Sequence, residues 1–165
     1  MTIVVFDNRS TRDTLKASMT ARLIDTLGGE TIEVIKEGPL PEGTTFLVLS
    51  GSSRCISKGE VHLPAVEVIY EAMEKKIPVL GICYGFQLLA HVHGYNVERL
   101  PERVREYRHV ESVGRVRFHH GDWVANLPHM HPFSDTVYGV QFHPESTPEG
   151  VEWLRRHIST SNKKK

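Results

Sequence analysis

The feature that most constrains the fold is a regular alternation between short apolar runs and longer segments with helical periodicity. The apolar runs are bounded by Gly, Pro, Asp or Ser and predict buried strands. The intervening segments place apolar residues three or four positions apart, which is the spacing of one helix face. Strands that are apolar on both faces, joined by helices, predict an α/β fold with a mostly parallel central sheet and helices on both faces.

The expected elements follow from these patterns. A helix is expected to begin near Ser10–Asp13, in a variant of the capping box, and to end at Gly28-Gly29. Further helices are expected from Pro64, over Phe86–His93 and from Thr147, while the C-terminal half is shorter and less regular. We expect one domain over residues 1–160 and a disordered basic tail over 161–165. Strands are expected at residues 3–6, 31–35, 45–49, 77–82 and 137–142.

Composition excludes several classes of protein. The 165 residues carry 20 Lys and Arg against 20 Asp and Glu, and this balance disfavours nucleic acid as the main partner. No apolar run is long enough to cross a bilayer, and the first residues lack the pattern of a signal peptide. Cys55 and Cys83 are too few for a disulfide framework, so a reduced, cytoplasmic protein is expected.

The strongest local motif is Gly81-Ile82-Cys83-Tyr84-Gly85, which lies between an expected strand and an expected helix. This is the pattern of a nucleophile elbow that carries Cys in place of Ser. Glycines on either side allow a sharp turn, and the amino end of the following helix favours a thiolate. The pattern predicts a nucleophile at Cys83; the alternative is a buried structural cysteine.

A thiolate nucleophile needs a base and a group that orients the base. His143 follows an expected strand, and Pro144 favours extended backbone at His143. Residues two apart in extended chain project to the same side, so Glu145 is expected beside His143. Taken alone, this pattern is more often produced by a solvated His and Glu after an edge strand.

The segments around Cys83 and His143 resemble the two signatures of class I glutamine amidotransferase domains. The resemblance implies a flavodoxin-like fold with Cys83, His143 and Glu145 as the catalytic triad. It also implies an oxyanion loop at Ser50–Ser53, with Gly51 in the loop and the N–H groups of Ser52 and Tyr84 as donors. Gln87 matches the family glutamine that contacts the substrate amide.

Within the family, the resemblance is strongest to the glutaminase part of GMP synthase. It rests on the elbow, on Arg105-Glu106-Tyr107 and on His120-Gly121-Asp122. Two departures stand out. Ser52-Ser53 replaces the second glycine and the proline of the usual Gly-Gly-Pro loop, and the stretch His129–Thr136 is shorter than in other members, which bears on substrate binding or docking.

The resemblance implies a glutaminase that hydrolyses L-glutamine to L-glutamate and ammonia, with no cofactor and no metal. The ammonia would pass to an ATP-dependent synthetase partner of the ATP-pyrophosphatase type, in GMP synthesis from XMP. Two alternatives are a free-standing cysteine hydrolase of γ-glutamyl amides or peptides, and a catalytically weak regulatory module. The paired histidines, such as His119-His120, lack the spacing of a zinc site.

Overall fold

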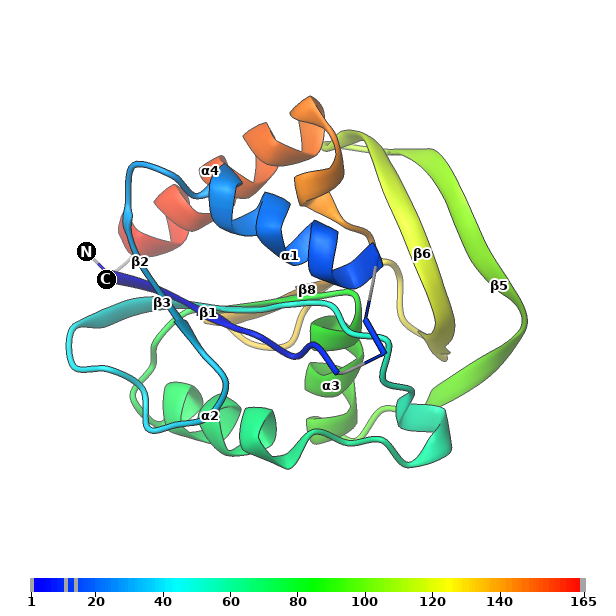
Figure 1. Ribbon diagram of the computed structural model, residues 1–165, viewed down its shortest axis with the longest axis horizontal. Helices are drawn as coiled ribbons and strands as arrows, with labels where there is room; N and C mark the ends of the chain where they lie inside the picture. The colour runs from blue at the N-terminus through cyan, green and yellow to red at the C-terminus, as the bar shows by residue number, and fades with distance from the viewer. Residues whose placement is uncertain (1, 11, 14, 164–165) are drawn as a thin grey trace.

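The computed structural model describes residues 2–10, 12–13 and 15–163. Within them the chain forms a six-stranded sheet in the order β2-β1-β3-β4-β8-β7, in which only β7 runs antiparallel to its neighbour. The predicted mostly parallel α/β fold is confirmed (Figure 1). The strands of this sheet are β1 (Thr2–Phe6), β2 (Thr31–Ile35), β3 (Thr44–Leu49), β4 (Val79–Ile82), β7 (Met130–Pro132) and β8 (Val137–Val140).

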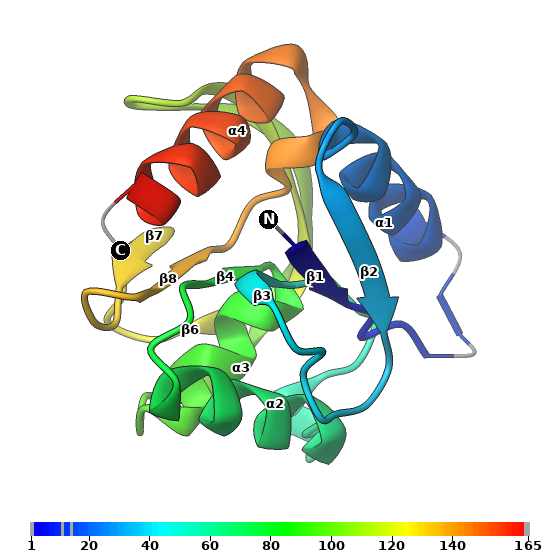
Figure 2. The same ribbon diagram turned by 90° about the vertical axis from the view of Figure 1, so that its left-hand side faces the viewer.

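Helices cover both faces of this sheet. Helices α1 (Leu15–Thr26) and α4 (Pro148–Lys163) lie on one face, and α2 (Leu63–Glu74) and α3 (Tyr84–Val92) lie on the other (Figures 1 and 2). The connections from β1 to β2 and from β3 to β4 cross over the sheet through α1 and α2, whereas β2 and β3 are joined by a loop without a helix. Among the described residues, no helix combines the length and the apolar character that crossing a membrane requires.

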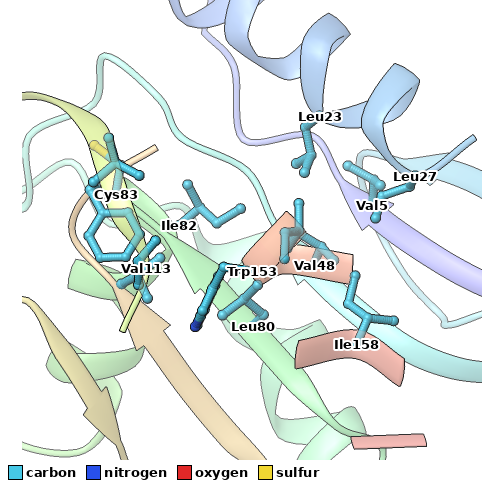
Figure 3. Packing of buried hydrophobic residues seen from close by; sticks show 14 of the residues in the cluster. Val5, Leu23, Leu27, Val48, Leu80, Ile82, Cys83, Val113, Trp153 and Ile158 are labelled. Carbon is cyan, nitrogen blue, oxygen red and sulfur yellow. The ribbon is translucent and has the colours of Figure 1, made fainter. Parts of the chain in front are cut away.

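The core consists of two apolar layers that share the central strands. Ile3 and Val5 of β1 face the layer under α1 and α4, whereas Val4 and Phe6 face the layer under α2 and α3. This alternation follows from the two-residue period of a strand and explains why the runs are apolar at every position. In the first layer Cys83 lies at one end of the cluster, at the end of β4 (Figure 3).

A long antiparallel hairpin stands beside the carboxyl end of the central strands. It consists of β5 (Val97–Val110) and β6 (Gly114–Val124), which pair with each other and form a separate two-stranded sheet (Figure 1). Its inner face packs Val116 and Phe118 into the core. On its outer face, Arg115 and Arg117 lie over the exposed Tyr107 ring, at 4.1 and 5.5 Å from its centre.

Several expected boundaries are wrong in ways that the residues explain. Helix α3 begins at Tyr84, directly after Cys83, and not at Phe86. Strand β4 begins only after Pro78, which has no N–H for the ladder. Helix α4 continues to Lys163, so residues 161–163 are helical and not a disordered tail, because neither Gly nor Pro interrupts the chain after Gly150.

Two further outcomes concern the first helix and the region expected to be less regular. Thr11 and Thr14 of the expected helix start lie outside the described residues, and α1 begins at Leu15. The periodicity of the C-terminal half did not reveal the β5–β6 hairpin. The short stretch His129–Thr136 still forms β7, which pairs with β8 at the sheet edge.

Candidate active site

Cys83 occupies a sharp turn between β4 and α3. Its backbone angles are φ 55° and ψ −104°, which L residues rarely adopt. A Cβ on Gly81 would lie 2.5 Å from the Gly85 carbonyl oxygen, and a Cβ on Gly85 would lie 2.6 Å from the Leu49 carbonyl oxygen. Both flanking positions therefore require glycine, and the nucleophile-elbow geometry predicted from the motif is present.

The Cys83 side chain is buried, and its sulfur contacts two other elements. The thiol donates to the carbonyl oxygen of His119 on β6, at 3.6 Å. Gln141 lies directly after β8, and its side-chain amide Nε2 donates to Cys83 Sγ at 3.7 Å. The Cys83 thiol is thus held between the main sheet and the hairpin.

His143 and Glu145 form a buried pair in the turn after β8. His143 Nδ1 and Glu145 Oε1 are 2.9 Å apart, and the two side chains are only 1% and 2% exposed. Pro144 begins a short 3₁₀ turn, Pro144–Ser146, which turns the carboxylate back toward the imidazole. The expectation that these two side chains lie beside each other is met, and solvation of both is excluded.

The sheet order brings the two halves of the site to one edge. Strands β4 and β8 are parallel neighbours, with Ile82 opposite Val140. Cys83 follows one strand and His143 follows the other, and the Cys83 N–H donates to the Val140 carbonyl oxygen at 2.8 Å. The carboxyl edge of a parallel sheet is where open α/β folds place ligands.

The predicted oxyanion loop follows β3 at the same edge. The Ser53 N–H donates to Asp13 Oδ1 at 2.7 Å, and the Asn8 N–H donates to Ser50 Oγ at 2.9 Å. Ser52 Oγ accepts the Arg54 N–H at 3.1 Å. The Asp13 carboxylate and the Asn8 backbone, both from the segment after β1, thus help to fix this loop.

A small pocket joins the loop, the elbow and the hairpin. Its volume is about 10 Å³, close to what one water molecule needs. The hairpin supplies one wall, and the pocket is too small to hold glutamine in this structure. The lining residues are Ser52, Ser53, Arg54, Cys55, Cys83, Gln87, Arg103, His119, His120, Gly121 and Asp122.

Two residues predicted to bind substrate have side chains engaged elsewhere. The Tyr84 hydroxyl donates to the Glu60 carbonyl oxygen at 2.7 Å and accepts the His62 N–H at 3.0 Å. Burial raises the pKa of Tyr84 to about 12, so this hydroxyl stays protonated at neutral pH. Gln87 Nε2 donates to the Asp122 carbonyl oxygen and to Gln141 Oε1, at 3.0 and 3.2 Å.

Sequence reasoning missed three residues at this site. Gln141 contacts the thiol, Asp122 binds the N–H and hydroxyl of Ser57 at 2.9 and 2.5 Å, and Arg103 lines the pocket. The two-residue spacing from Gln141 to His143 was a usable signal. Asp122 and Arg103 lie on the hairpin, which no periodicity predicted. Among the described residues, no group of three His, Cys, Asp or Glu side chains is placed to hold a metal ion.

A parallel α/β sheet with a cysteine elbow after one strand and a His–Glu pair in the turn after the neighbouring strand defines a class of α/β proteins built around a nucleophile elbow. The class-I glutamine amidotransferase family matches residues 29–131. The chain belongs to this family.

The relatives agree with this assignment. A GMP synthase (glutamine-hydrolysing) from Cytophaga hutchinsonii is 28% identical, covering 77% of this chain and 30% of that protein. The GMP synthase of Emericella nidulans is 35% identical over 50% of this chain and 22% of its own length. The chain therefore spans less than a third of these curated relatives.

A solved structure shows the same fold. It is a protein from Thermoplasma acidophilum, described as one of the subunits of a GMP synthase, and it superposes with a TM-score of 0.73 at 22% identity. The match covers 98% of this chain and 94% of that one. The fold is therefore shared over nearly the whole length of both chains.

Proposed function

We propose that the protein hydrolyses L-glutamine to L-glutamate and ammonia through a thioester on Cys83. The observation that carries this proposal is that the Cys83 elbow and the buried His143–Glu145 pair follow two neighbouring parallel strands at the same edge of the sheet. Family membership supports glutamine as the substrate. The chemistry needs no cofactor, because the thiol, an imidazole and water supply every group.

In the first half-reaction, the Cys83 sulfur attacks the side-chain amide carbon of glutamine. The thiol proton passes to His143, and the carbonyl oxygen becomes an oxyanion bound by the N–H groups of Ser52 and Tyr84. Gly51 belongs to the same proposed loop. His143 then donates its proton to the leaving nitrogen, ammonia departs, and a γ-glutamyl thioester remains on Cys83.

In the second half-reaction, water replaces ammonia. His143 takes a proton from water, the hydroxide adds to the thioester carbon, and the carbon–sulfur bond breaks to release glutamate. The proton returns to the Cys83 sulfur, which restores the starting state. Glu145 holds the imidazole through Nδ1, leaving the other ring nitrogen for proton transfer, and stabilises the imidazolium form.

The natural acceptor of the ammonia is proposed to lie outside these 165 residues. Both relatives described above are glutamine-hydrolysing GMP synthases, so the proposed partner is an ATP-dependent synthetase that aminates XMP. The small pocket supports a dependence on this partner, because a volume of about 10 Å³ must widen before it holds glutamine. The cytoplasm is the proposed location.

The first test concerns the nucleophile. A diazoketone glutamine analogue is expected to modify Cys83 and leave Cys55 unmodified, as read by mass spectrometry of peptides. Cys83→Ala should abolish ammonia release while circular dichroism and thermal unfolding show an intact fold. Cys55→Ala is the matched control and should retain activity. Ammonia release by Cys83→Ala would remove Cys83 from the mechanism.

The second test concerns the partner and the substrate. Ammonia release from glutamine should be low for this chain alone and should rise when a GMP-forming synthetase, ATP and XMP are added. Arg105→Ala should weaken this stimulation without changing the labelling of Cys83. Full activity without the synthetase, with γ-glutamyl dipeptides preferred over glutamine, would favour a free-standing hydrolase. Inactivity under every condition would favour a regulatory module.

A further inference from the structure

Three arginines surround the entrance to the pocket at Cys83, and two of them are already engaged. Arg54 Nη1 donates to the Asn8 carbonyl oxygen at 2.6 Å. Arg99 Nη1 lies 3.3 Å from Cys55 Sγ and 3.7 Å from Asp122 Oδ1. These two guanidinium groups therefore fix the loop and the hairpin in place.

The third arginine, Arg103, differs from the other two. It lines the pocket together with Cys83, and its side chain lies against Gly121. A Cβ on Gly121 would be 2.8 Å from Arg103 Nη1, so the absence of a side chain there makes room for the guanidinium. Among the described residues, no hydrogen bond or ion pair engages Arg103. The carboxylate that lines the pocket, Asp122, is already bound by Ser57, so the Arg103 guanidinium is available to an anion.

We propose that Arg103 binds the α-carboxylate of the substrate, which rests on the function proposed above. Glutamine presents one fixed anionic group, and a guanidinium binds a carboxylate through two parallel hydrogen bonds. When the amide carbon of glutamine is at Cys83, the α-carboxylate must point away from the buried elbow toward the entrance, where Arg103 lies. The interaction selects amino-acid amides with a free carboxylate over glutamine residues inside a peptide.

The backbone around Arg103 is irregularly paired, which allows the Arg103 side chain to move when the pocket changes shape. Strand pairing between β5 and β6 is irregular between Arg99 and Val104, and Arg103 falls within this segment. Arg103 itself is exposed. Because the closed pocket has room for about one water, glutamine enters only if the hairpin or its side chains shift. Arg103 then meets the carboxylate as the site closes again.

The test compares two reagents that differ only in this carboxylate. 6-Diazo-5-oxo-L-norleucine carries the α-carboxylate of glutamine, whereas its methyl ester does not. In the unmodified protein, Cys83 should react with the free acid at least about tenfold faster than with the ester. Arg103→Leu should abolish this preference by slowing only the reaction with the acid, and Arg103→Lys should restore part of it.

Arg105→Leu is the matched control, because Arg105 lies on the same strand, pairs with His119 and does not line the pocket. It should keep the full preference for the acid. Iodoacetamide, which is small and neutral, should label Cys83 equally in all variants and so report an intact thiol. In the ammonia assay, Arg103→Leu should raise KM for glutamine about 10- to 100-fold with little change in kcat.

The outcomes separate this proposal from the proposed function. An undiminished preference for the acid in Arg103→Leu would overturn the role of Arg103, even if the chain hydrolyses glutamine. Equal reactivity of the unmodified protein toward the acid and the ester would also overturn it. An Arg103-dependent preference in a protein that releases no ammonia would support carboxylate binding while contradicting glutaminase activity.

Discussion

The elbow around Cys83 and the β5–β6 hairpin build the same pocket by opposite means. At the elbow, residues 81–85 are all buried, and two glycines contact backbone atoms of neighbouring segments. On the hairpin, β6 lines the pocket with buried residues such as His119 and Asp122, whereas β5 has no fully buried residue and contributes the exposed Arg103. The elbow wall is fixed by backbone packing, and the movable part of the opposite wall consists of exposed side chains from β5.

This difference places the groups proposed for catalysis and the groups proposed for substrate binding on different walls of the pocket. The groups proposed to break the amide bond lie on the rigid side, where small displacements would be costly to the rate. The group proposed to recognise the substrate, Arg103, lies on the exposed strand β5, whereas β6 is attached to the body by the packing of Val116 and Phe118 and by polar contacts such as that between Asp122 and Ser57. Substitutions at the elbow and on the hairpin should therefore have different effects on activity and on stability.

The largest effect is expected within the rigid side. His143→Ala removes the proton carrier and should reduce kcat/KM about 10²- to 10⁴-fold, the usual range for a general acid–base group. Glu145→Gln removes the charge that orients the imidazole but keeps its shape, so the loss should be smaller. Steady-state ammonia release measures both. Equal losses in the two variants would show that the carboxylate does more than orient His143.

The sharpest comparison uses one glycine from each side. Gly85→Ala drives a Cβ into the Leu49 backbone and should lower the free energy of unfolding by about 1–3 kcal/mol. Gly121→Ala meets only the ends of the Arg99 and Arg103 side chains, which can move, so the cost should be within about 0.5 kcal/mol. Urea unfolding measures both. A larger loss for Gly121→Ala would reverse the assignment of rigid and movable walls.

A smaller effect is expected where the sheet edge supports the thiol. Gln141 donates to Cys83 Sγ, and this hydrogen bond stabilises the thiolate more than the thiol. Gln141→Leu should therefore reduce the thiolate fraction of Cys83 at a given pH, by an amount that corresponds to about 1 kcal/mol. The pH dependence of alkylation by iodoacetamide reports this change. Gln87→Leu, which leaves the contacting amide in place, should shift the profile less.

Much of the fold was predictable because buried strands have a recognisable apolar pattern in the sequence. Runs such as Ile3–Phe6 are apolar at every position since both faces of the strand are covered, and few environments besides a covered sheet produce this pattern. The β5–β6 hairpin was not predictable in the same way. Its β5 strand is mostly exposed and rich in charged side chains, and its partly buried residues are mostly three or four positions apart, so the two-residue period of a strand is missing.

The residues of the candidate site also differ in how well the sequence predicts them. Cys83, His143 and Glu145 follow strands, and the sheet order places them at one edge. The spacing from Gln141 to His143 places Gln141 near the site, but its contact with the thiol and the position of Arg103 depend on tertiary packing. Gln87 illustrates the limit, since its position in the motif did not reveal that its amide binds Gln141 and Asp122.

The left-handed conformation of Cys83 has a thermodynamic consequence for the whole domain. A non-glycine residue held at such angles costs about 1–3 kcal/mol, which is a substantial part of the net stability of a single domain. Glycine at the same position would avoid this cost but would have no sulfur. Selection for stability and selection for a thiol therefore oppose each other at this one residue, and apolar burial elsewhere must offset the difference.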